Sequence, residues 1–266
     1  MDFEKTGSVP NSPLVTVVTA AFNALDGVKT TVASVAEQSF RSVEHIVVDG
    51  GSTDGTVAYL RSLGHAVRWI SEPDRGIADA LNKGVAMARG EYILVLQAED
   101  TFLDAESLAR AAPHLRSDTE IVSFGVLMVN GQILRPIFGH GLGLRMSFHM
   151  TVPHQGVFCQ RAVFDRIGKF DTSLAVAMDY DFFMRARECG ARVAVIHEVL
   201  SVMPATGISS QLAWKGLRRR MDEFKTVHYR YAHSSVMRAV YHLYWLAYPP
   251  FKRVRSALDR RLRERQ

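Results

Sequence analysis

Two adjacent carboxylates, Glu99 and Asp100, follow the apolar segment YILVL at residues 92–96. Neighbouring carboxylates at the end of a buried strand repel each other unless a cation neutralises them. Carboxylate oxygens are the ligands that Mg²⁺ and Mn²⁺ prefer, and these ions often bridge a protein to substrate phosphates. The pair is consistent with a metal–phosphate site, although by itself it is more typical of the start of a solvated loop.

The segment VVDGGSTDGT, residues 47–56, is a second candidate. Its glycines allow a sharp turn close to a ligand, and its Ser, Thr and Asp side chains offer polar contacts or a helix cap. It lacks the Gly-Lys-Ser/Thr of a Walker loop and the spacing of a dinucleotide fingerprint. Taken alone, it is either a binding loop or a plain strand–turn–helix connection.

A third segment, EPDRGIADALNKG at residues 72–84, places Arg75 just before a predicted helix. Arginine and the free amides of a helix start both favour an anionic ligand. The structural alternative is that Asp74 or Asp79 pairs with Arg75.

Strands and helices that alternate over the first hundred residues must position these three segments. We expect strands at 14–20, 43–49, 66–71 and 91–97, and helices at 26–38, 55–63 and 76–89, with Asp26 and Asp54 as caps of the first two helices. Four such repeats predict a parallel, doubly wound α/β sheet. Right-handed crossovers then place every loop after a strand on one edge, which brings the three segments together.

After residue 104 the alternation loosens. We predict a hairpin of strands 119–129 and 132–137 around Asn130-Gly131, helices at 161–167 and 179–189, and a strand at 191–200. A charged helix follows at 211–231, then an aromatic-rich segment at 236–248 that Pro249 and Pro250 should separate from the basic end.

The composition is that of a globular protein, with 266 residues of which 47% are hydrophobic. Two cysteines argue against a disulfide framework and favour the cytoplasm. We see no signal peptide and no apolar stretch of transmembrane length. The net charge of +5 is concentrated at the C-terminal end, but no nucleic-acid recognition motif accompanies it, so we expect no nucleic-acid partner.

Taken together, the segments resemble the family 2 glycosyltransferases, which have the GT-A fold and generally invert the anomeric carbon. The resemblance covers residues 13–210, between a tail at 1–12 and a helical, aromatic and basic extension at 211–266. It rests on VTVVTAAFNA (15–24), VASVAEQSF (32–40), HIVVDGGSTDGT (45–56), WISEPDRGIADALNKGVAMARGEYILVLQAED (69–100), PHQGVF (153–158), FDTSLAVAMDYDFFMR (170–185) and TGIS (206–209).

The resemblance implies roles for individual residues. The acidic pair would hold the metal and the donor, with Asp100 the better metal ligand and Glu99 the second contact. Arg75 would lie near the base or the phosphates. The remaining nucleotide contacts would come from Ala21, Asn23, Asp49 and Gly51.

The catalytic base of the family lies at the start of a later helix, and the resemblance assigns it to Asp179, with Asp181 as the fallback. On a helix these two side chains point about 200° apart, so only one can face the site. His154 and Gln155 would line the acceptor side, although a plain hydrogen-bonding role is the alternative. Residues 206–209 would close over donor and acceptor.

The chain departs from the family at three positions. Gly50 stands where many members have a second aspartate that reads the uracil ring, which leaves the base undetermined. Glu99 replaces one of two metal-site aspartates but still offers oxygen ligands, so we expect activity to be retained. Phe22 replaces a commoner tyrosine and can stack without donating a hydrogen bond.

The aromatic side chains of residues 236–251 adjoin basic residues, as in a helix that lies on an anionic membrane. The face would comprise Tyr241, Tyr244, Trp245, Tyr248 and Phe251. The alternative is that these rings pack against the catalytic domain or another subunit.

The sequence therefore predicts an inverting glycosyltransferase that uses Mn²⁺ or Mg²⁺ and a nucleotide-diphosphate sugar. A UDP-sugar is favoured over a GDP- or dTDP-sugar. The acceptor would be a glycan or a lipid-linked molecule of cell-surface polysaccharide, lipopolysaccharide or glycolipid synthesis. We expect the protein in the cytoplasm, either free or peripheral on the inner face of the cell membrane. The alternative is a non-catalytic sugar-nucleotide-binding or scaffold protein of the same fold. A nucleotidyltransferase would need an early glycine-rich loop with a lysine, which is missing.

Overall fold

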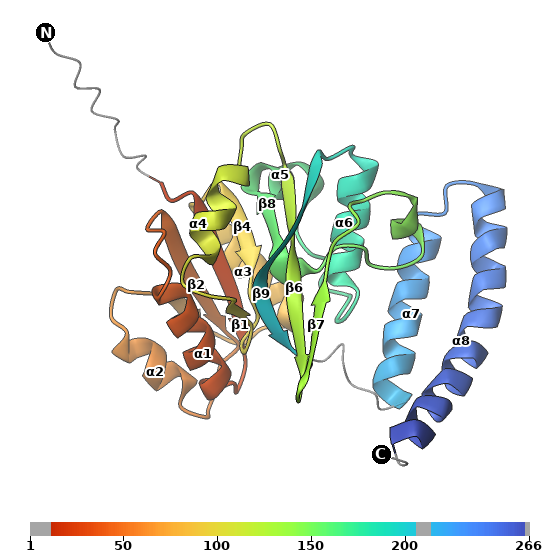
Figure 1. Ribbon diagram of the computed structural model, residues 1–266, viewed down its shortest axis with the longest axis horizontal. Coiled ribbons are helices and arrows are strands. Elements are labelled where there is room, and N and C mark those ends of the chain that lie inside the picture. Colours follow the sequence, from red (N-terminus) through yellow and green to blue (C-terminus); the bar gives the residue numbers. More distant parts are fainter. Residues whose placement is uncertain (1–11, 206–213, 264–266) are drawn as a thin grey trace, which may run out of the picture. The chain divides into compact units, whose positions relative to one another are not determined.

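A computed structural model describes the chain over residues 12–205 and 214–263. The chain divides into two compact units, Met1–Thr206 and Gly207–Gln266. The first unit holds the β-sheet, and the second holds helices α7 (Trp214–Arg230) and α8 (Ser235–Arg263) (Figure 1). The loop that we expected to close at 206–209 lies outside the described residues, as does the N-terminal tail up to residue 11.

The first four strands confirm the predicted parallel sheet. They are β1 (Val15–Ala21), β2 (Val43–Asp49), β3 (Arg68–Ser71) and β4 (Tyr92–Val95), in the spatial order β3-β2-β1-β4 with every neighbouring pair parallel. Helices α1 (Leu25–Ala36), α2 (Thr56–Ser62) and α3 (Ile77–Met87) connect them. Parallel strands end at one edge of the sheet, so the loops after β1, β2 and β4 share that edge.

Helices cover both faces of this half of the sheet (Figure 1). On one face, Val28 and Val32 of α1 pack with Ala21 and Val47. On the other face, α3 approaches β1 so closely that a Cβ at Gly84 would be 2.3 Å from a methyl carbon of Val18. Burial on both faces explains why β1 is apolar or β-branched along its whole length.

The second half of the sheet is mixed. β8 (Val157–Gln160) is antiparallel to β4 and to β6 (Ile121–Asn130), while β9 (Val193–Pro204) is parallel to β6. Of the remaining strands, β5 (Thr101–Phe102) is antiparallel to β9, and β7 (Ile133–Ile137) is antiparallel to β6. The predicted hairpin turn lies between β6 and β7, with Gly131 at φ 58°. Helices α4 (Ser107–Ala111), α5 (Arg161–Ile167) and α6 (Met178–Glu188) complete the unit.

The start of α1 corrects one prediction, because Asp26 does not cap it. The helix begins at Leu25, whose N–H donates to Asp54 Oδ2 at 2.9 Å. The other oxygen of Asp54 accepts from the backbone N–H of Thr56 at 3.0 Å. One carboxylate after β2 therefore holds the starts of both α1 and α2.

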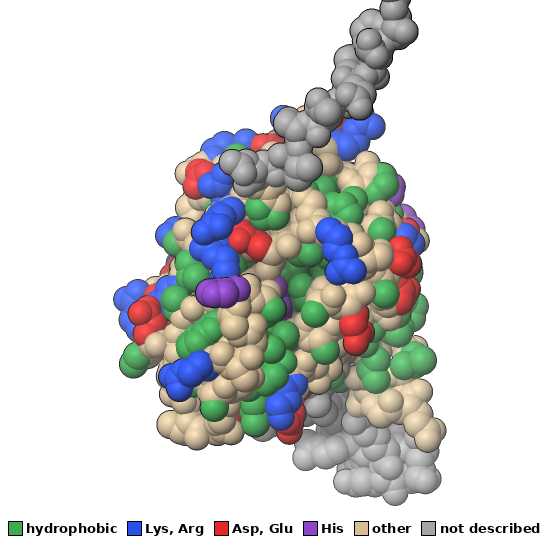
Figure 2. Space-filling model, turned by 90° about the vertical axis from the view of Figure 1, so that its left-hand side faces the viewer, with side chains coloured by type: hydrophobic (Ala, Val, Ile, Leu, Met, Phe, Trp, Pro, Cys, Tyr) green, Lys and Arg blue, Asp and Glu red, His purple; other side chains and the backbone are tan. Residues whose placement is uncertain are grey.

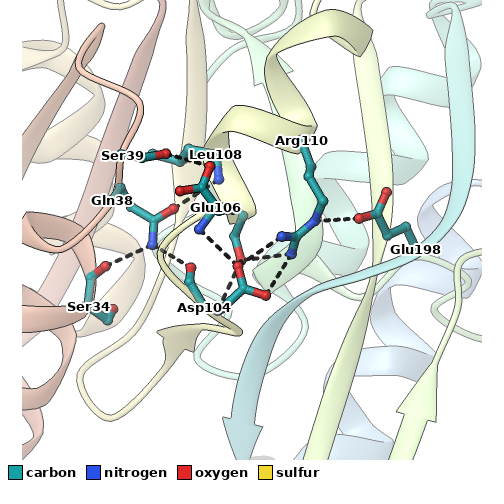
Figure 3. Close-up of polar contacts among 9 residues, drawn as sticks. Ser34, Gln38, Ser39, Asp104, Glu106, Leu108, Arg110 and Glu198 are labelled. Atoms are coloured by element: carbon teal, nitrogen blue, oxygen red, sulfur yellow. Dashed lines mark hydrogen bonds and ion pairs between the residues drawn. The ribbon is translucent and has the colours of Figure 1, made fainter.

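A polar cluster holds the segment after β5 in place (Figure 3). Arg110 of α4 donates two hydrogen bonds to the carboxylate of Asp104, at 2.9 and 3.1 Å, and a third to Glu198 of β9. Gln38 at the end of α1 donates to the Asp104 carbonyl at 2.8 Å and accepts from the Leu108 N–H at 2.9 Å. The cluster thus ties α1, α4 and β9 together beyond the turn that carries Glu99 and Asp100.

The C-terminal unit is a helix pair built around His228 of α7. The ring of Tyr241 stacks on His228 at 4.6 Å between centroids, and Trp245 Nε1 donates to His228 Nδ1 at 3.0 Å. These two aromatic residues are buried, so they do not belong to an exposed face of α8 as we had expected.

Pro249 and Pro250 do not separate the aromatic segment from the basic end as we predicted, because α8 continues through both prolines to residue 263. Each proline removes one helical N–H donor and is disfavoured in a helix, but the turns on both sides are long enough to sustain the helix.

In the described part of the chain, no helix combines the length and the apolar content that crossing a bilayer requires. On the face of the molecule drawn in Figure 2, basic and acidic side chains of the described residues are interspersed.

Candidate active site

The loops after β1 and β2 are held against each other by Asn23. This residue has a positive φ of 48°, a backbone conformation that asparagine tolerates. Its N–H donates to Ser52 Oγ at 2.7 Å, and its side-chain oxygen accepts from the Thr53 N–H at 2.9 Å. Asn23 therefore fixes the loop in which the sequence predicted nucleotide contacts.

Asp49 is fully buried and organises the same loop from below. Its Oδ2 accepts from the N–H groups of Gly51 and Ser52, at 3.1 and 2.9 Å, and from the Ser71 hydroxyl at 2.7 Å. The Ser52 hydroxyl also donates to Oδ1. Beside it, the Ala21 carbonyl accepts from the Gly50 N–H. A nucleotide role for Asp49, Ala21 and Gly51 stays a prediction. In this geometry the three residues would contribute to nucleotide binding by shaping the loop backbone.

The turn after β4 presents the acidic pair. Asp100 Oδ2 accepts from the Gln97 N–H at 3.0 Å, and the Thr31 hydroxyl donates to the Asp100 carbonyl at 2.8 Å. Glu99 is exposed and has a φ of 84°, which is rare for a residue with a side chain and stores strain. Its N–H donates to the Gly27 carbonyl in the first turn of α1 at 3.2 Å. The first turn of α1 therefore contacts both the loop after β2 and the turn after β4.

Asp100 is only 4% exposed. Burial raises the pKa of its carboxyl group to about 6, although the charge of His154, the Gln97 N–H and the Gln155 side chain act in the opposite direction. Gln155 is itself buried, and its backbone carbonyl accepts from the Ser201 hydroxyl. It therefore supports Asp100 from the interior, whereas the acceptor-side role that we predicted for it stays untested.

Asp179, in the first turn of α6, lies next to His154. Asp179 Oδ2 is 3.1 Å from His154 Nδ1, and both side chains remain partly exposed. Burial lowers the pKa of His154, but the hydrogen bond that its ring donates to Asp179 and the charges of Asp179 and Asp100 outweigh this effect, so the pKa is raised. The imidazole thus lies beside the residue predicted as catalytic base, and its charge acts on the residue predicted as metal ligand.

Asp181 has different surroundings. It is 1% exposed and pairs with Arg185 one turn later, with Arg185 Nε 3.0 Å from Asp181 Oδ2. The same guanidinium donates to the carbonyls of Gly168 and Lys169, at 3.0 and 2.6 Å. Asp181 therefore anchors α6 to the loop after α5, which leaves Asp179 as the carboxylate of this helix that faces the site.

A largely apolar pocket lies beside Asp179. Its polar lining consists of Gln97, His154 and Asp179. The rest of the lining is apolar and comes from Leu81, Ile93, Val95, Val157, Cys159, Phe164, Phe170, Met178, Phe182 and Phe183. The pocket therefore brings Gln97, from the turn after β4, together with Asp179 at the start of α6.

Arg75 and its neighbours lie at the same edge, before α3. Arg75 is exposed and pairs with Asp79 at 3.2 Å, the structural alternative that the sequence had raised. Asp74 instead accepts from the Gly76 N–H at 2.7 Å. The exposed guanidinium is still available to a ligand, so its contact with the donor remains a prediction.

The residues present fit a divalent metal whose shell the substrate completes. Among the described residues, no group of three or more His, Cys, Asp or Glu side chains could hold a metal ion. Mg²⁺ and Mn²⁺ sites on nucleotides commonly use one or two carboxylates together with substrate phosphates, and Asp100 and Glu99 supply that number. Neither Asp100 nor Asp179 has a Lys or Arg partner among the described residues, so a bound cation would add positive charge to that of His154.

Comparison with known proteins identifies the family. The profile of "Glycosyl transferase family 2" matches residues 16–163, which is more than half of the chain. The chain belongs to glycosyltransferase family 2. A protein of Mycobacterium tuberculosis named "Uncharacterized glycosyltransferase" is 36% identical over 231 residues, which cover 83% of this chain and 86% of that protein. A "PGL/p-HBAD biosynthesis glycosyltransferase" of Mycobacterium bovis is 27% identical over 221 residues, or 79% and 84% of the two chains.

Solved structures confirm that this glycosyltransferase has the GT-A fold. S. aureus TarS 1-349 in complex with UDP-GlcNAc superposes with a TM-score of 0.64 at 19% identity, covering 80% of this chain and 66% of that one. A mannosyltransferase from Pyrobaculum calidifontis in complex with GDP-Man and Mn²⁺ gives 0.62 at 21% identity, with coverage of 88% and 69%. The chain spans 39% of the longer TarS structure.

Sequence reasoning missed two residues that support the site. Thr31 is completely buried on the otherwise apolar side of α1 and holds the turn of the acidic pair. Ser71 at the end of β3 donates to Asp49. A hydroxyl in an apolar helix face was a signal for Thr31, whereas nothing in the sequence indicated the partner of Ser71.

Proposed function

We propose that this chain is an inverting glycosyltransferase that moves a sugar from a nucleotide-diphosphate donor to a glycan or lipid-linked acceptor. The observation that carries the proposal is that Asp179, His154 and Gln97 line one pocket, with Asp179 Oδ2 3.1 Å from His154 Nδ1 and the Gln97 N–H donating to Asp100. The pocket brings the turn after β4 to the start of α6, although Asp179 follows Asp100 by 79 residues in the chain. A carboxylate suited to a metal and a carboxylate suited to proton transfer thus occupy neighbouring but separate positions.

In the proposed reaction, an acceptor oxygen attacks the anomeric carbon while the bond from that carbon to the diphosphate oxygen breaks. Asp179 takes the proton of the acceptor hydroxyl. His154 orients Asp179 through the contact of its Nδ1 with Oδ2. Asp100 and Glu99 would hold Mn²⁺ or Mg²⁺, which would offset the charge that grows on the leaving diphosphate. A single displacement with base and leaving group on opposite sides of the sugar inverts the anomeric carbon.

The names of similar proteins support the finer parts of the proposal. The complexes of TarS with UDP-GlcNAc and of the mannosyltransferase with GDP-Man and Mn²⁺ support a nucleotide-sugar donor and a divalent metal. The relative named for PGL/p-HBAD biosynthesis supports an acceptor in glycolipid or other cell-surface synthesis. We favour a UDP-sugar, with a GDP- or dTDP-sugar as the alternatives.

A thermal-shift screen of UDP-, GDP- and dTDP-sugars with Mn²⁺ or Mg²⁺ tests donor binding, because a ligand of the native state raises its melting temperature. We expect one nucleotide class to raise the melting temperature only when metal is present. Release of the nucleoside diphosphate on addition of acceptors then tests catalysis. Binding without turnover for any acceptor would support the non-catalytic scaffold, and no binding at all would contradict the proposal.

We also propose that α8 binds an anionic membrane surface. Large apolar side chains recur along one side of the helix and are mostly exposed, among them Val236 (73%), Leu243 (66%), Leu246 (61%) and Phe251 (56%). Residues 235–263 contain seven Lys or Arg residues and one Asp. An apolar face on a basic helix favours anionic lipid, and it would bring the enzyme to a lipid-linked acceptor on the inner face of the membrane.

Co-sedimentation with phosphatidylcholine vesicles, with and without phosphatidylglycerol, tests this surface. We expect binding that needs the anionic lipid and that is lost in the double variant Leu243→Ser/Leu246→Ser. The control is Ile133→Ser/Leu134→Ser, which removes equally exposed side chains (66% and 62%) from the β6–β7 hairpin. If both variants bind like the wild type, the membrane proposal is wrong; a wild type that dimerises through α8 would identify a second copy as the partner instead.

A further inference from the structure

A carboxylate oxygen of Asp74 lies where a side chain at position 50 would stand. A Cβ added to Gly50 would be 2.5 Å from Asp74 Oδ2 and 3.3 Å from a ring carbon of Phe22. The first distance is too short for real atoms, so a larger residue at position 50 would displace Asp74. Three segments therefore meet at this point: the end of β1, the end of β2 and the loop before α3.

The carboxylate of Asp74 is oriented by its own backbone turn. Its Oδ1 accepts from the Gly76 N–H at 2.7 Å, while the neighbouring Arg75 pairs with Asp79. Within the described part of the chain, Asp74 Oδ2 accepts no hydrogen bond and Asp74 has no ion pair. The half-buried side chain thus presents one fixed oxygen that can still accept a donor.

The ring of Phe22 also reaches the space over Gly50, since one of its carbons would lie 3.3 Å from the added Cβ, and Phe22 is 64% exposed. An exposed aromatic face with a hydrogen-bond acceptor at its margin is the arrangement that a nucleobase requires, since bases stack on aromatic rings and offer N–H groups along their edge. We propose that Phe22 and Asp74 bind the base of the donor, with Phe22 stacking on it and Asp74 Oδ2 accepting its ring N–H. The inference rests on the proposed function, because it assumes a nucleotide donor at this edge of the sheet.

This pair of residues selects a class of base. An ionised carboxylate only accepts hydrogen bonds. Uracil, thymine and guanine carry a ring N–H on the pairing edge, whereas cytosine and adenine carry a lone pair there, which the carboxylate repels. Asp74 would therefore favour the first three bases, and it would replace the carboxylate that this chain lacks at Gly50.

The test is calorimetric titration of UDP, GDP, CDP and ADP in the presence of Mn²⁺. We expect the wild type to bind UDP or GDP more tightly than CDP and ADP. Asp74→Asn should weaken the preferred nucleotide about tenfold or more, since a hydrogen bond to a charged group is lost. It should also narrow the preference over CDP, because an amide N–H can donate to the ring nitrogen of cytosine. The control Asp118→Asn makes the same change at an exposed residue and should leave all four affinities unchanged.

A second variant tests the geometry without altering Asp74. Gly50→Ala places a Cβ against Asp74 Oδ2 and should reduce the preference for UDP over CDP, whereas Gly143→Ala, which meets open space, should not. The inference is overturned if the wild type binds UDP and neither Asp74→Asn nor Gly50→Ala changes the UDP-to-CDP ratio. Equal weakening of all four nucleotides would also overturn it, since Asp74 would then only shape the loop. A wild type that binds none of them contradicts the proposed function as well.

Discussion

Asp100 and Asp104 are four residues apart, and their surroundings shift the pKa values of their carboxyl groups in opposite directions. Arg110 donates two hydrogen bonds to the carboxylate of Asp104, which hold the pKa of that carboxyl below its usual value (Figure 3). Asp100 is buried, its protein contacts are the Gln97 N–H, Gln155 and His154, and burial raises its pKa to about 6. The fold itself supplies a cation to Asp104, whereas we propose that a bound metal ion supplies one to Asp100.

The same contrast recurs within α6. Asp181 is buried against Arg185, whose guanidinium also anchors the loop after α5. Asp179, two residues earlier, is partly exposed and meets only the imidazole of His154 among possible cationic partners in the described residues. In both comparisons, the carboxylate with an arginine holds elements together, and the carboxylate without one belongs to the site that we propose for donor and acceptor.

The difference teaches how charge separates structural from functional acidic residues. A buried or half-buried carboxylate without a cation lowers the stability of the fold unless hydrogen bonds satisfy it, as they do at Asp49. A ligand or a reaction that needs the carboxylate is then a reason for its presence. Adjacent positions in the sequence can thus belong to different classes. Replacing the carboxylate without an arginine (Asp100 or Asp179) should therefore affect metal binding or catalysis. Replacing the carboxylate with an arginine (Asp104 or Asp181) should affect stability.

The largest expected effect is that of Asp179→Asn. An amide cannot take the acceptor proton, so the transfer rate should fall about 10²- to 10⁴-fold, the typical contribution of a general base. Nucleotide affinity and the melting temperature should stay close to those of the wild type, because Asp179 contacts neither the donor loops nor an arginine. Single-turnover transfer and calorimetric titration of the nucleotide measure the two parts.

Asp181→Asn is the matched variant. The Asp181 side chain is only 1% exposed, so the substitution leaves Arg185 without its charged partner inside the protein. We expect the free energy of unfolding to fall by about 3 kcal/mol, as for other buried ion pairs that lose one member. Folded protein should still transfer sugar. If Asp181→Asn were folded but inactive while Asp179→Asn stayed active, the base would have to be reassigned to Asp181.

The sequence was sufficient for the parallel half of the sheet and for the family. Short β-branched strands that alternate with amphipathic helices leave few other arrangements, and the topology then placed Asp49, Asp100 and Arg75 at one edge. It also predicted the turn at Asn130-Gly131, because this dipeptide suits the positive φ that Gly131 adopts.

Errors arose where a contact between distant segments overrode a local signal. Asp26 has the right type and position for a cap, but Asp54 from another loop supplies the acceptor to Leu25. The rings of Tyr241 and Trp245 suggested a membrane face until His228 of α7 provided their packing partner. The contact between Asp74 and position 50 joins two loops, and no spacing in the sequence encodes it.

The smallest expected effects are on stability at Asp100 and Asp104. Asp104→Asn loses a two-fold hydrogen-bonded ion pair whose aspartate is 47% exposed, so the free energy of unfolding should fall by about 1 kcal/mol. Asp100→Asn removes a buried charge without an arginine or lysine partner and keeps an oxygen for the Gln97 N–H. It should leave the metal-free protein as stable as the wild type or about 1 kcal/mol more stable.

Urea denaturation without metal or nucleotide measures both effects, with the exposed Asp118→Asn as the control that should change stability by less than about 0.5 kcal/mol. Adding Mn²⁺ and UDP should then stabilise Asp104→Asn as it stabilises the wild type, but not Asp100→Asn, because only the latter lacks the ligand for the metal. If Asp100→Asn were the less stable variant without metal and still gained the full stabilisation with it, Asp100 would serve the fold, and the contrast between the two carboxylates would be reversed.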